Sequence, residues 1–257
     1  YLVKPNARVI VDVTRVCGAH CRACINSLYE ETMPDEYYSG AAGPKVVRGD
    51  RKAETLTRLK AFSQLREGYF IEARKAMDFA VHKAGIHAIT LTGGEPTNIG
   101  PKLMRLLEEI GPRSFPEVND IKLFTHGGPL LEHFPKWDKK GERYEKNALN
   151  ELIDRGVTHL TISRHHDQDP TNREYMGDVV PDQEQLTEIV KQAKERGVYV
   201  RLSCLVQKGY IETPEDMLRY AEWAKGIGVD AVIFRALAMS EALTQEETAR
   251  ANTIDDW

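Results

Sequence analysis

Five helix-like apolar stripes recur along the chain, and each ends at a glycine that is followed by a short apolar, β-branched run. This order is typical of βα units, in which a helix stops at a glycine and the next strand enters the core. The five runs are Ala88–Leu91, Ile121–Phe124, Leu160–Ser163, Val198–Arg201 and Ala231–Phe234. With Arg8–Val13 at the front, the pattern predicts six strands that alternate with helices.

Residues within these strands alternate in polarity, so one face of the predicted sheet is apolar and the other is polar. Between Val198 and Cys204, the polar side consists of Tyr199, Arg201 and Ser203. The same rule applied to the other strands collects a larger polar set, namely Asp12, Thr14, Thr90, Thr92, Lys122, His126, Thr161, Ser163, His165 and Arg235. Because polar groups are costly to bury without partners, this face is expected either to bind ligand or water or to form a self-satisfied network.

Two segments fall outside the repeating pattern. Residues 25–67 are interpreted as an insertion over the mouth of the barrel, either a substrate lid or a solvated excursion. Residues 238–257 form a tail in which Thr244 and Glu247 suggest the capping box of a short helix. We therefore expect one core domain over residues 1–237, which includes the insertion, followed by this tail. Within the core, Thr213, Pro214 and Asp216 predict a helix start.

Length and charge narrow the classes of protein. A chain of 257 residues with 41% hydrophobic content can bury one sizeable core. Its formal charge is −4 and no long basic block is present, so no nucleic-acid partner is expected. No run of eighteen apolar residues and no secretory leader is visible, so we expect a cytosolic protein without a membrane partner.

Three of the four cysteines, Cys17, Cys21 and Cys24, form a Cys-x3-Cys-x2-Cys run directly after the first strand. Three thiolates on one short loop suit a four-iron cluster with one open iron better than a tetrahedral zinc site, which needs a fourth ligand. His20 is a candidate for that fourth ligand, so a non-catalytic zinc-binding protein is the alternative.

A second motif, Gly93-Gly94-Glu95-Pro96, follows the second predicted strand. Glycines let a backbone approach a ligand closely, and a carboxylate beside them complements an ammonium group. Together with the cysteine run, this motif resembles the radical S-adenosylmethionine (radical SAM) superfamily. Ala23 departs from the family pattern, which usually has an aromatic residue before the third cysteine and near the adenine.

The resemblance implies a partial (β/α)6 radical SAM barrel with a loop insertion after the cluster motif and a short C-terminal helix. It also implies a [4Fe-4S] cluster held by the three cysteines, and S-adenosyl-L-methionine (SAM) bound with its methionine end at Gly93, Gly94, Glu95 and Pro96. The expected reaction is reductive cleavage of SAM to a 5′-deoxyadenosyl radical, with flavodoxin or ferredoxin as the low-potential electron donor.

Within the superfamily, the chain is most similar to the branch that contains the GTP cyclase of molybdenum-cofactor biosynthesis. The likeness lies in Val13–Cys17 and Val200–Gly209, and it implies that Ser163, Ser203 and Leu205 contact SAM. The tail lacks the auxiliary-cluster cysteines, which argues against that enzyme's own activity. We expect hydrogen abstraction from a polar small molecule in cofactor or natural-product biosynthesis. The candidate substrate-binding residues are Lys122, His126, Tyr199, Arg201 and Arg235.

Three further residues are candidate catalytic groups with several interpretations. His165 and His166, next to two acids at the barrel mouth, would bind substrate, relay a proton, hold a second metal with His126, or serve structure alone. Cys204 would return a hydrogen atom to a substrate radical, as in some radical SAM epimerases, which would make the chain a peptide-modifying enzyme. Its alternation with Ser203 instead points the thiol toward the helices, unless a bulge reverses the facing.

Overall fold

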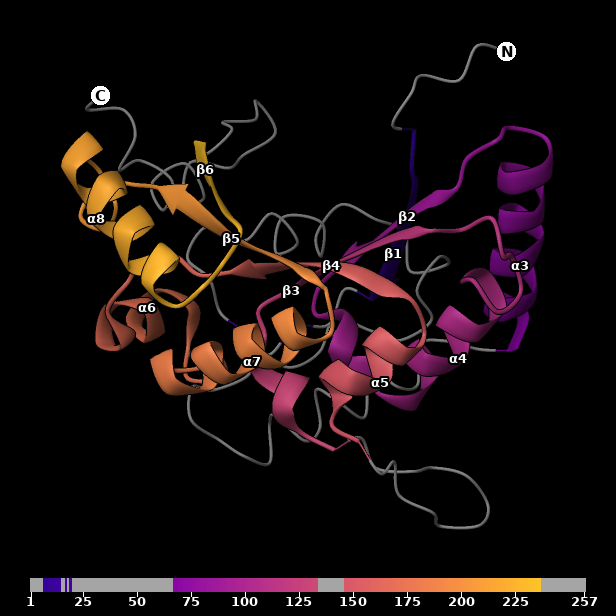
Figure 1. Cartoon of the computed structure of the whole chain (residues 1–257), viewed down its shortest axis with the longest axis horizontal. Coiled ribbons are helices and arrows are strands. Elements are labelled where there is room, and N and C mark those ends of the chain that lie inside the picture. Colours follow the sequence, from indigo (N-terminus) through magenta and orange to yellow (C-terminus); the bar gives the residue numbers. More distant parts are fainter. Residues whose placement is uncertain (1–6, 15–16, 18, 20–66, 134–145, 237–257) are drawn as a thin grey trace, which may run out of the picture.

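A computed structural model describes residues 7–14, 17, 19, 67–133 and 146–236 of the chain. The predictions for Cys21, Cys24, His20, the tail, and the insertion up to residue 66 lie outside these residues. Within them, six parallel strands form one open sheet whose spatial order is the chain order, β1-β2-β3-β4-β5-β6 (Figure 1). The predicted α/β partial barrel is therefore confirmed.

The strands are β1 (Val9–Thr14), β2 (Ala88–Gly93), β3 (Asp120–Thr125), β4 (Val157–Ser163), β5 (Tyr199–Val206) and β6 (Ala231–Ala236). The α-helices are α3 (Glu67–His82), α4 (Pro101–Ile110), α5 (Ala148–Asp154), α6 (Asp169–Met176), α7 (Gln183–Glu195) and α8 (Pro214–Gly226). Two short 3-10 helices, η1 (Pro96–Ile99) and η2 (Gly128–Leu131), follow β2 and β3.

The helices begin and end largely where local chemistry predicts. At α8, the Thr213 side chain accepts from the Asp216 N–H and the Asp216 carboxylate accepts from the Thr213 N–H, a capping box that confirms the predicted helix start. These hydrogen bonds lower the pKa of Asp216 below its ordinary value. In α3 the buried residues are Phe70, Met77, Ala80 and Val81, whereas Ala76 is exposed.

The core lies between the apolar face of the sheet and the helices. α4, α5 and α7 lie along this face, with α3 near the β1 end and α8 near the β6 end (Figure 1). The alternating strand residues that point toward the helices are buried, among them Ile89, Leu91, Ile121, Leu123, Leu160, Ile162, Val200 and Leu202. Burying aliphatic side chains of this size is worth about 1.5 to 3 kcal/mol each, so this layer stabilises the sheet that carries the polar face.

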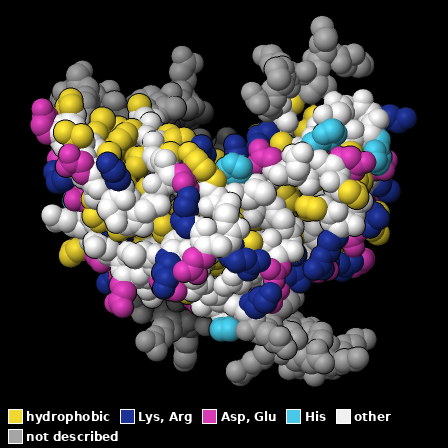
Figure 2. Space-filling model, in the orientation of Figure 1, with side chains coloured by type: hydrophobic (Ala, Val, Ile, Leu, Met, Phe, Trp, Pro, Cys, Tyr) yellow, Lys and Arg dark blue, Asp and Glu magenta, His cyan; other side chains and the backbone are white. Residues whose placement is uncertain are grey.

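The opposite face of the sheet is concave and carries the polar side chains. Figure 2 shows a hollow along the upper edge of the molecule, with histidine and basic side chains at its floor. In the part of the chain that the structure describes, no helix is long and apolar enough to span a bilayer.

Candidate functional site

The two sequence motifs meet at the carboxyl ends of adjacent strands. Thr14 at the end of β1 is the register partner of Gly93 at the end of β2, and Cys17 follows three positions after Thr14. Gly93 has φ 124, which non-glycine residues rarely adopt. Cys17 is half-buried and is not in a disulfide. A thiol and a permissive backbone are thus brought to one edge of the sheet, where parallel α/β folds bind ligands.

Glu95 connects the end of β2 to the end of β3. Its carboxylate is fully buried, with 0% exposure. Oε1 accepts hydrogen bonds from the Thr97 N–H at 3.1 Å, the Thr97 hydroxyl at 2.6 Å and the Thr125 hydroxyl at 2.7 Å. Oε2 accepts from the His126 N–H at 2.7 Å and lies 3.5 Å from His126 Nε2.

Three of these four donors converge on Oε1, so Oε2, with one donor, keeps a lone-pair position. In this structure Glu95 caps η1 and joins two strand ends. Its predicted contact with the SAM amino group stays a prediction. Pro96, at the first position of η1, is buried beside it.

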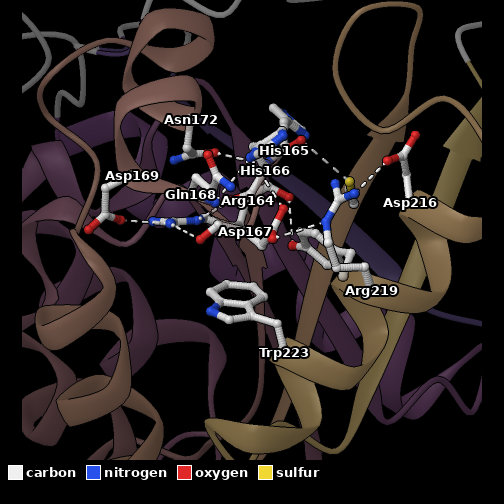
Figure 3. Close-up of polar contacts among 12 residues, drawn as sticks. Arg164, His165, His166, Asp167, Gln168, Asp169, Asn172, Asp216, Arg219 and Trp223 are labelled. Atoms are coloured by element: carbon white, nitrogen blue, oxygen red, sulfur yellow. Dashed lines mark hydrogen bonds and ion pairs between the residues drawn. The ribbon is translucent and has the colours of Figure 1, made fainter.

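The loop that follows β4 is fixed by one arginine (Figure 3). Arg164 is 1% exposed, and its guanidinium donates to the carbonyls of His166, Asp167 and Pro181 at 2.7, 3.1 and 3.0 Å. It also pairs with Asp169 at 2.7 Å and lies 5.3 Å from the centre of a Trp223 ring. The guanidinium therefore gives this polar loop one conformation.

His165 and His166 both lie inside this loop rather than on the concave face of β4. The strand ends at Ser163, so its alternation does not fix the direction of His165. His165 Nδ1 accepts from the Leu205 N–H at 3.2 Å and the ring packs edge-on against Tyr175 of α6. Burial lowers the pKa of His165 to about 4, so the ring is neutral at physiological pH.

His166 Nδ1 accepts from the Gln168 N–H at 3.0 Å, and burial lowers the pKa of His166. His126 Nδ1 likewise accepts a backbone hydrogen bond, from Gly128 at 3.1 Å. The three predicted histidines thus anchor turns. Among the described residues, no group of three His, Cys, Asp or Glu side chains forms a metal site. A catalytic role for His165 or His166 stays a prediction.

The predicted SAM-contacting residues lie on neighbouring strands. Ser163 of β4 is the register partner of Ser203 of β5, and Leu205 follows on the same face of β5. Between them, Cys204 is 0% exposed and packs in the core. Burial raises the pKa of its thiol to about 12. Cys204 therefore faces the helices, as the alternation predicts, and its position supports the structural alternative.

The polar residues of the concave face were expected either to bind ligand or water or to form a self-satisfied network. Deeper in this face, the two arrangements occur at different places. Near the amino ends of the strands, Arg8 pairs with Asp120 and donates to the Thr90 hydroxyl at 2.9 Å, while His159 lies 3.1 Å from Asp120. This part is a self-satisfied network. Lys122, in register between Thr90 and His159, adds a positive charge there.

Toward the β5 and β6 side, the polar face is less satisfied. Arg201 of β5 donates to the Thr161 hydroxyl at 3.0 Å, and its Nε atom is buried without a partner among the described residues. Arg201 and Arg235 both lie over the ring of Phe124, with centroid distances of 5.8 and 5.6 Å. Tyr199, the fifth candidate, is exposed and stacks near His159 at 5.3 Å.

Sequence reasoning missed four residues that build this region, namely Arg8, Phe124, Thr125 and Arg164. Arg8 and Phe124 belong to strands whose alternation was recognised, so their facing was predictable even though their partners were not. Thr125 and Arg164 lie at strand ends, where alternation stops and contacts depend on the loops.

Solved structures with the same fold include enzymes that use SAM. No protein-family model and no curated protein matches this sequence. Similar structures include methylornithine synthase PylB and anSMEcpe with bound AdoMet, each with TM-score 0.53 and 13% identity. Another is the radical SAM methyltransferase TsrM of Kitasatospora setae with cobalamin and a [4Fe-4S] cluster, with TM-score 0.51 and 13% identity. The alignments cover 91%, 97% and 89% of this chain.

The same alignments cover 54%, 59% and 36% of the respective neighbours, so this chain spans about half their length or less. At 13% identity the likeness concerns the backbone. The open six-stranded parallel sheet of this chain is therefore the partial barrel found in solved radical SAM enzymes.

Proposed function

We propose that this chain is a radical SAM enzyme. The observation that carries the proposal is the register pair Thr14–Gly93, which brings the start of the cysteine run next to the Gly93–Pro96 motif at one edge of the sheet. The two motifs are far apart in the sequence, and each follows one of two adjacent parallel strands. The likeness in fold to TsrM, solved with a [4Fe-4S] cluster, and to anSMEcpe, solved with AdoMet, supports the same conclusion.

The residues present fit the proposed cofactors. Cys17 is a half-buried thiol outside any disulfide, at the strand end where the ligand loop begins. Cys17, Cys21 and Cys24 would hold a [4Fe-4S] cluster, which would supply the electron that cleaves SAM to a 5′-deoxyadenosyl radical. A low-potential donor such as flavodoxin or ferredoxin would reduce it.

The chain's own residues would position the bound cofactors and the substrate. Gly93 and Gly94 offer backbone next to the end of β1, and Glu95 fixes that backbone through its hydrogen bonds to the end of β3. Ser163 and Ser203, paired on neighbouring strands, would contact other parts of SAM. The substrate would lie on the concave face near Arg201. This position on the face would also keep the reacting groups away from bulk water.

The substrate we propose is a polar small molecule, because the concave face carries charged side chains close together. The likeness to the molybdenum-cofactor GTP cyclase branch rests on the two matching sequence segments and stays a prediction. A second candidate function is peptide modification, which is favoured by the likeness in fold to anSMEcpe, also solved with a bound peptide. The buried position of Cys204 gives no support to the version in which that thiol supplies the hydrogen atom.

Metal content after anaerobic reconstitution tests the proposal. We expect about four iron and four sulfide ions per chain, and a low-temperature electron paramagnetic resonance signal of the reduced cluster that changes when SAM is added. Cys17→Ala should lose most of the iron, whereas Cys204→Ala should keep it. Uptake of one zinc ion per chain, with no iron-dependent signal, would support the zinc-binding alternative instead.

A further inference from the structure

We infer that Arg201 and Arg235 form a binding site for an anionic group of the substrate, a carboxylate or a phosphate. The two side chains come from adjacent strands, β5 and β6, and converge on the ring of Phe124 on β3. Both guanidinium carbons lie within 6 Å of that ring centre, so the two cations are less than about 12 Å apart. The inference rests on the proposed function, because it concerns that enzyme's substrate.

Among the described residues, the two cations have no paired counter-charge, although Arg201 is partly buried. No carboxylate among the described residues pairs with either of them, and Arg201 donates a hydrogen bond to the neutral Thr161 hydroxyl. The Arg201 Nε atom is buried and unpartnered. Burial, followed by repulsion from Arg235, lowers the pKa of Arg201 from its ordinary value. A bound anion would remove both unfavourable effects.

The remaining charges of the concave face do not supply the missing anion. The acid Asp120 on this face is already paired with Arg8 and lies beside His159 and Lys122. Arg201 also lies close enough to His159 to lower its pKa, after the larger effect of burial. This side of the concave face is thus a positive surface, which attracts anions.

The position of the pair suits a substrate rather than a structural ion. Arg201 precedes Ser203 by two residues on β5, so it lies about 7 Å deeper than the predicted SAM contact. Arg235, in register with Leu205, lies about 7 Å on the other side of that level, so an anionic group bound between the two side chains would lie beside the predicted SAM contact. Both guanidiniums lie near the Phe124 ring, and the planar N–H fork of an arginine suits a two-oxygen ligand.

The SAM carboxylate is the other source of the same chemistry, and binding measurements separate the two. The first experiment is a calorimetric titration of the reconstituted protein with succinate and with inorganic phosphate at constant ionic strength. Arg201→Gln and Arg235→Gln should each weaken binding of the preferred anion about tenfold or more, whereas Arg201→Lys should keep part of it. Arg74→Gln, which removes the same charge from the outer surface of α3, should change nothing.

SAM affinity is measured in the same variants, by equilibrium dialysis. The inference requires that Arg201→Gln and Arg235→Gln leave SAM affinity within about twofold of the unmodified protein. If SAM affinity falls and anion affinity does not, the pair binds the SAM carboxylate and the substrate assignment is overturned. Equal anion binding in all variants would likewise refute the site. Because Arg235 is exposed, its variant remains informative even where Arg201→Gln fails to fold.

The radical SAM assignment and the anion site can fail independently of each other. A protein that never cleaves SAM but loses succinate or phosphate binding in the two variants would keep the anion site and lose the radical SAM assignment. A protein that cleaves SAM but binds neither anion through these arginines would do the reverse.

Discussion

Replacing Glu95 with glutamine tests whether this carboxylate mainly stabilises two strand ends or mainly binds the amino group of a ligand. Glutamine has nearly the same shape, so the change alters charge and hydrogen bonding while leaving packing intact. The amide nitrogen would take the place of Oε2, since Oε1 receives three of the four hydrogen bonds. Two donors, the new amide and the His126 N–H, would then face each other.

The cost follows from these contacts. The charge-assisted hydrogen bond from the His126 N–H is lost and this donor is left buried and unpaired, which costs about 1 to 3 kcal/mol. The three remaining bonds weaken because their acceptor becomes neutral. We therefore expect Glu95→Gln to lower the free energy of unfolding by about 3 to 5 kcal/mol.

Urea denaturation followed by circular dichroism measures this value, with both proteins in the same metal-loading state. The matched control is Glu109→Gln on α4, where the ion pair with Arg74 at 2.9 Å is partly exposed and should contribute less than about 1 kcal/mol. A Glu95→Gln protein that unfolds within 1 kcal/mol of the original, while losing SAM affinity, would refute the reasoning. It would mean that the carboxylate acts mainly on the ligand.

Three further predictions concern the loop after β4 and the strand beside it. Arg164→Met should lower the free energy of unfolding by about 3 to 5 kcal/mol in the same denaturation assay, because three backbone carbonyls and Asp169 lose their donor. The pKa of His165 is depressed in the folded state to about 4 and ordinary in the unfolded state, so it should cost stability as the pH falls from about 6.5 toward 4. Its ring resonance should not titrate between pH 6 and 8, and His165→Gln should flatten the pH dependence of unfolding. Cys204 should resist alkylation at pH 8 until the protein unfolds, and Cys204→Ala should leave SAM cleavage unchanged. Rapid labelling of Cys204 in the folded protein, or loss of turnover in Cys204→Ala with continued 5′-deoxyadenosine formation, would revive its catalytic alternative.

The sequence predicted the sheet because period-two alternation and helix-ending glycines are local signals. The same alternation oriented Cys204 toward the core and Arg201 and Arg235 toward the concave face. These predictions hold wherever the residue lies within a strand. They depend only on the extended backbone, which places neighbouring side chains on opposite faces.

Predictions were weakest just beyond the strand ends. His165 was assigned to the concave face by extending the alternation of β4, but the strand stops at Ser163 and the ring packs against Tyr175 instead. The hydrogen bonds of Glu95 to Thr97, Thr125 and His126 could not be predicted, because only the meeting of β2 and β3 brings these residues together. The contact of Glu95 with the SAM amino group stays a prediction. Loop conformation depends on such long-range contacts, which no local pattern contains.

The most direct test of the radical SAM assignment is the formation of 5′-deoxyadenosine. The protein is reconstituted anaerobically with iron and sulfide, and then given dithionite and SAM beside a Cys21→Ala control. We predict that the nucleoside forms only when Cys21 is intact. Absence of SAM cleavage in a protein that instead takes up stoichiometric zinc would contradict the assignment.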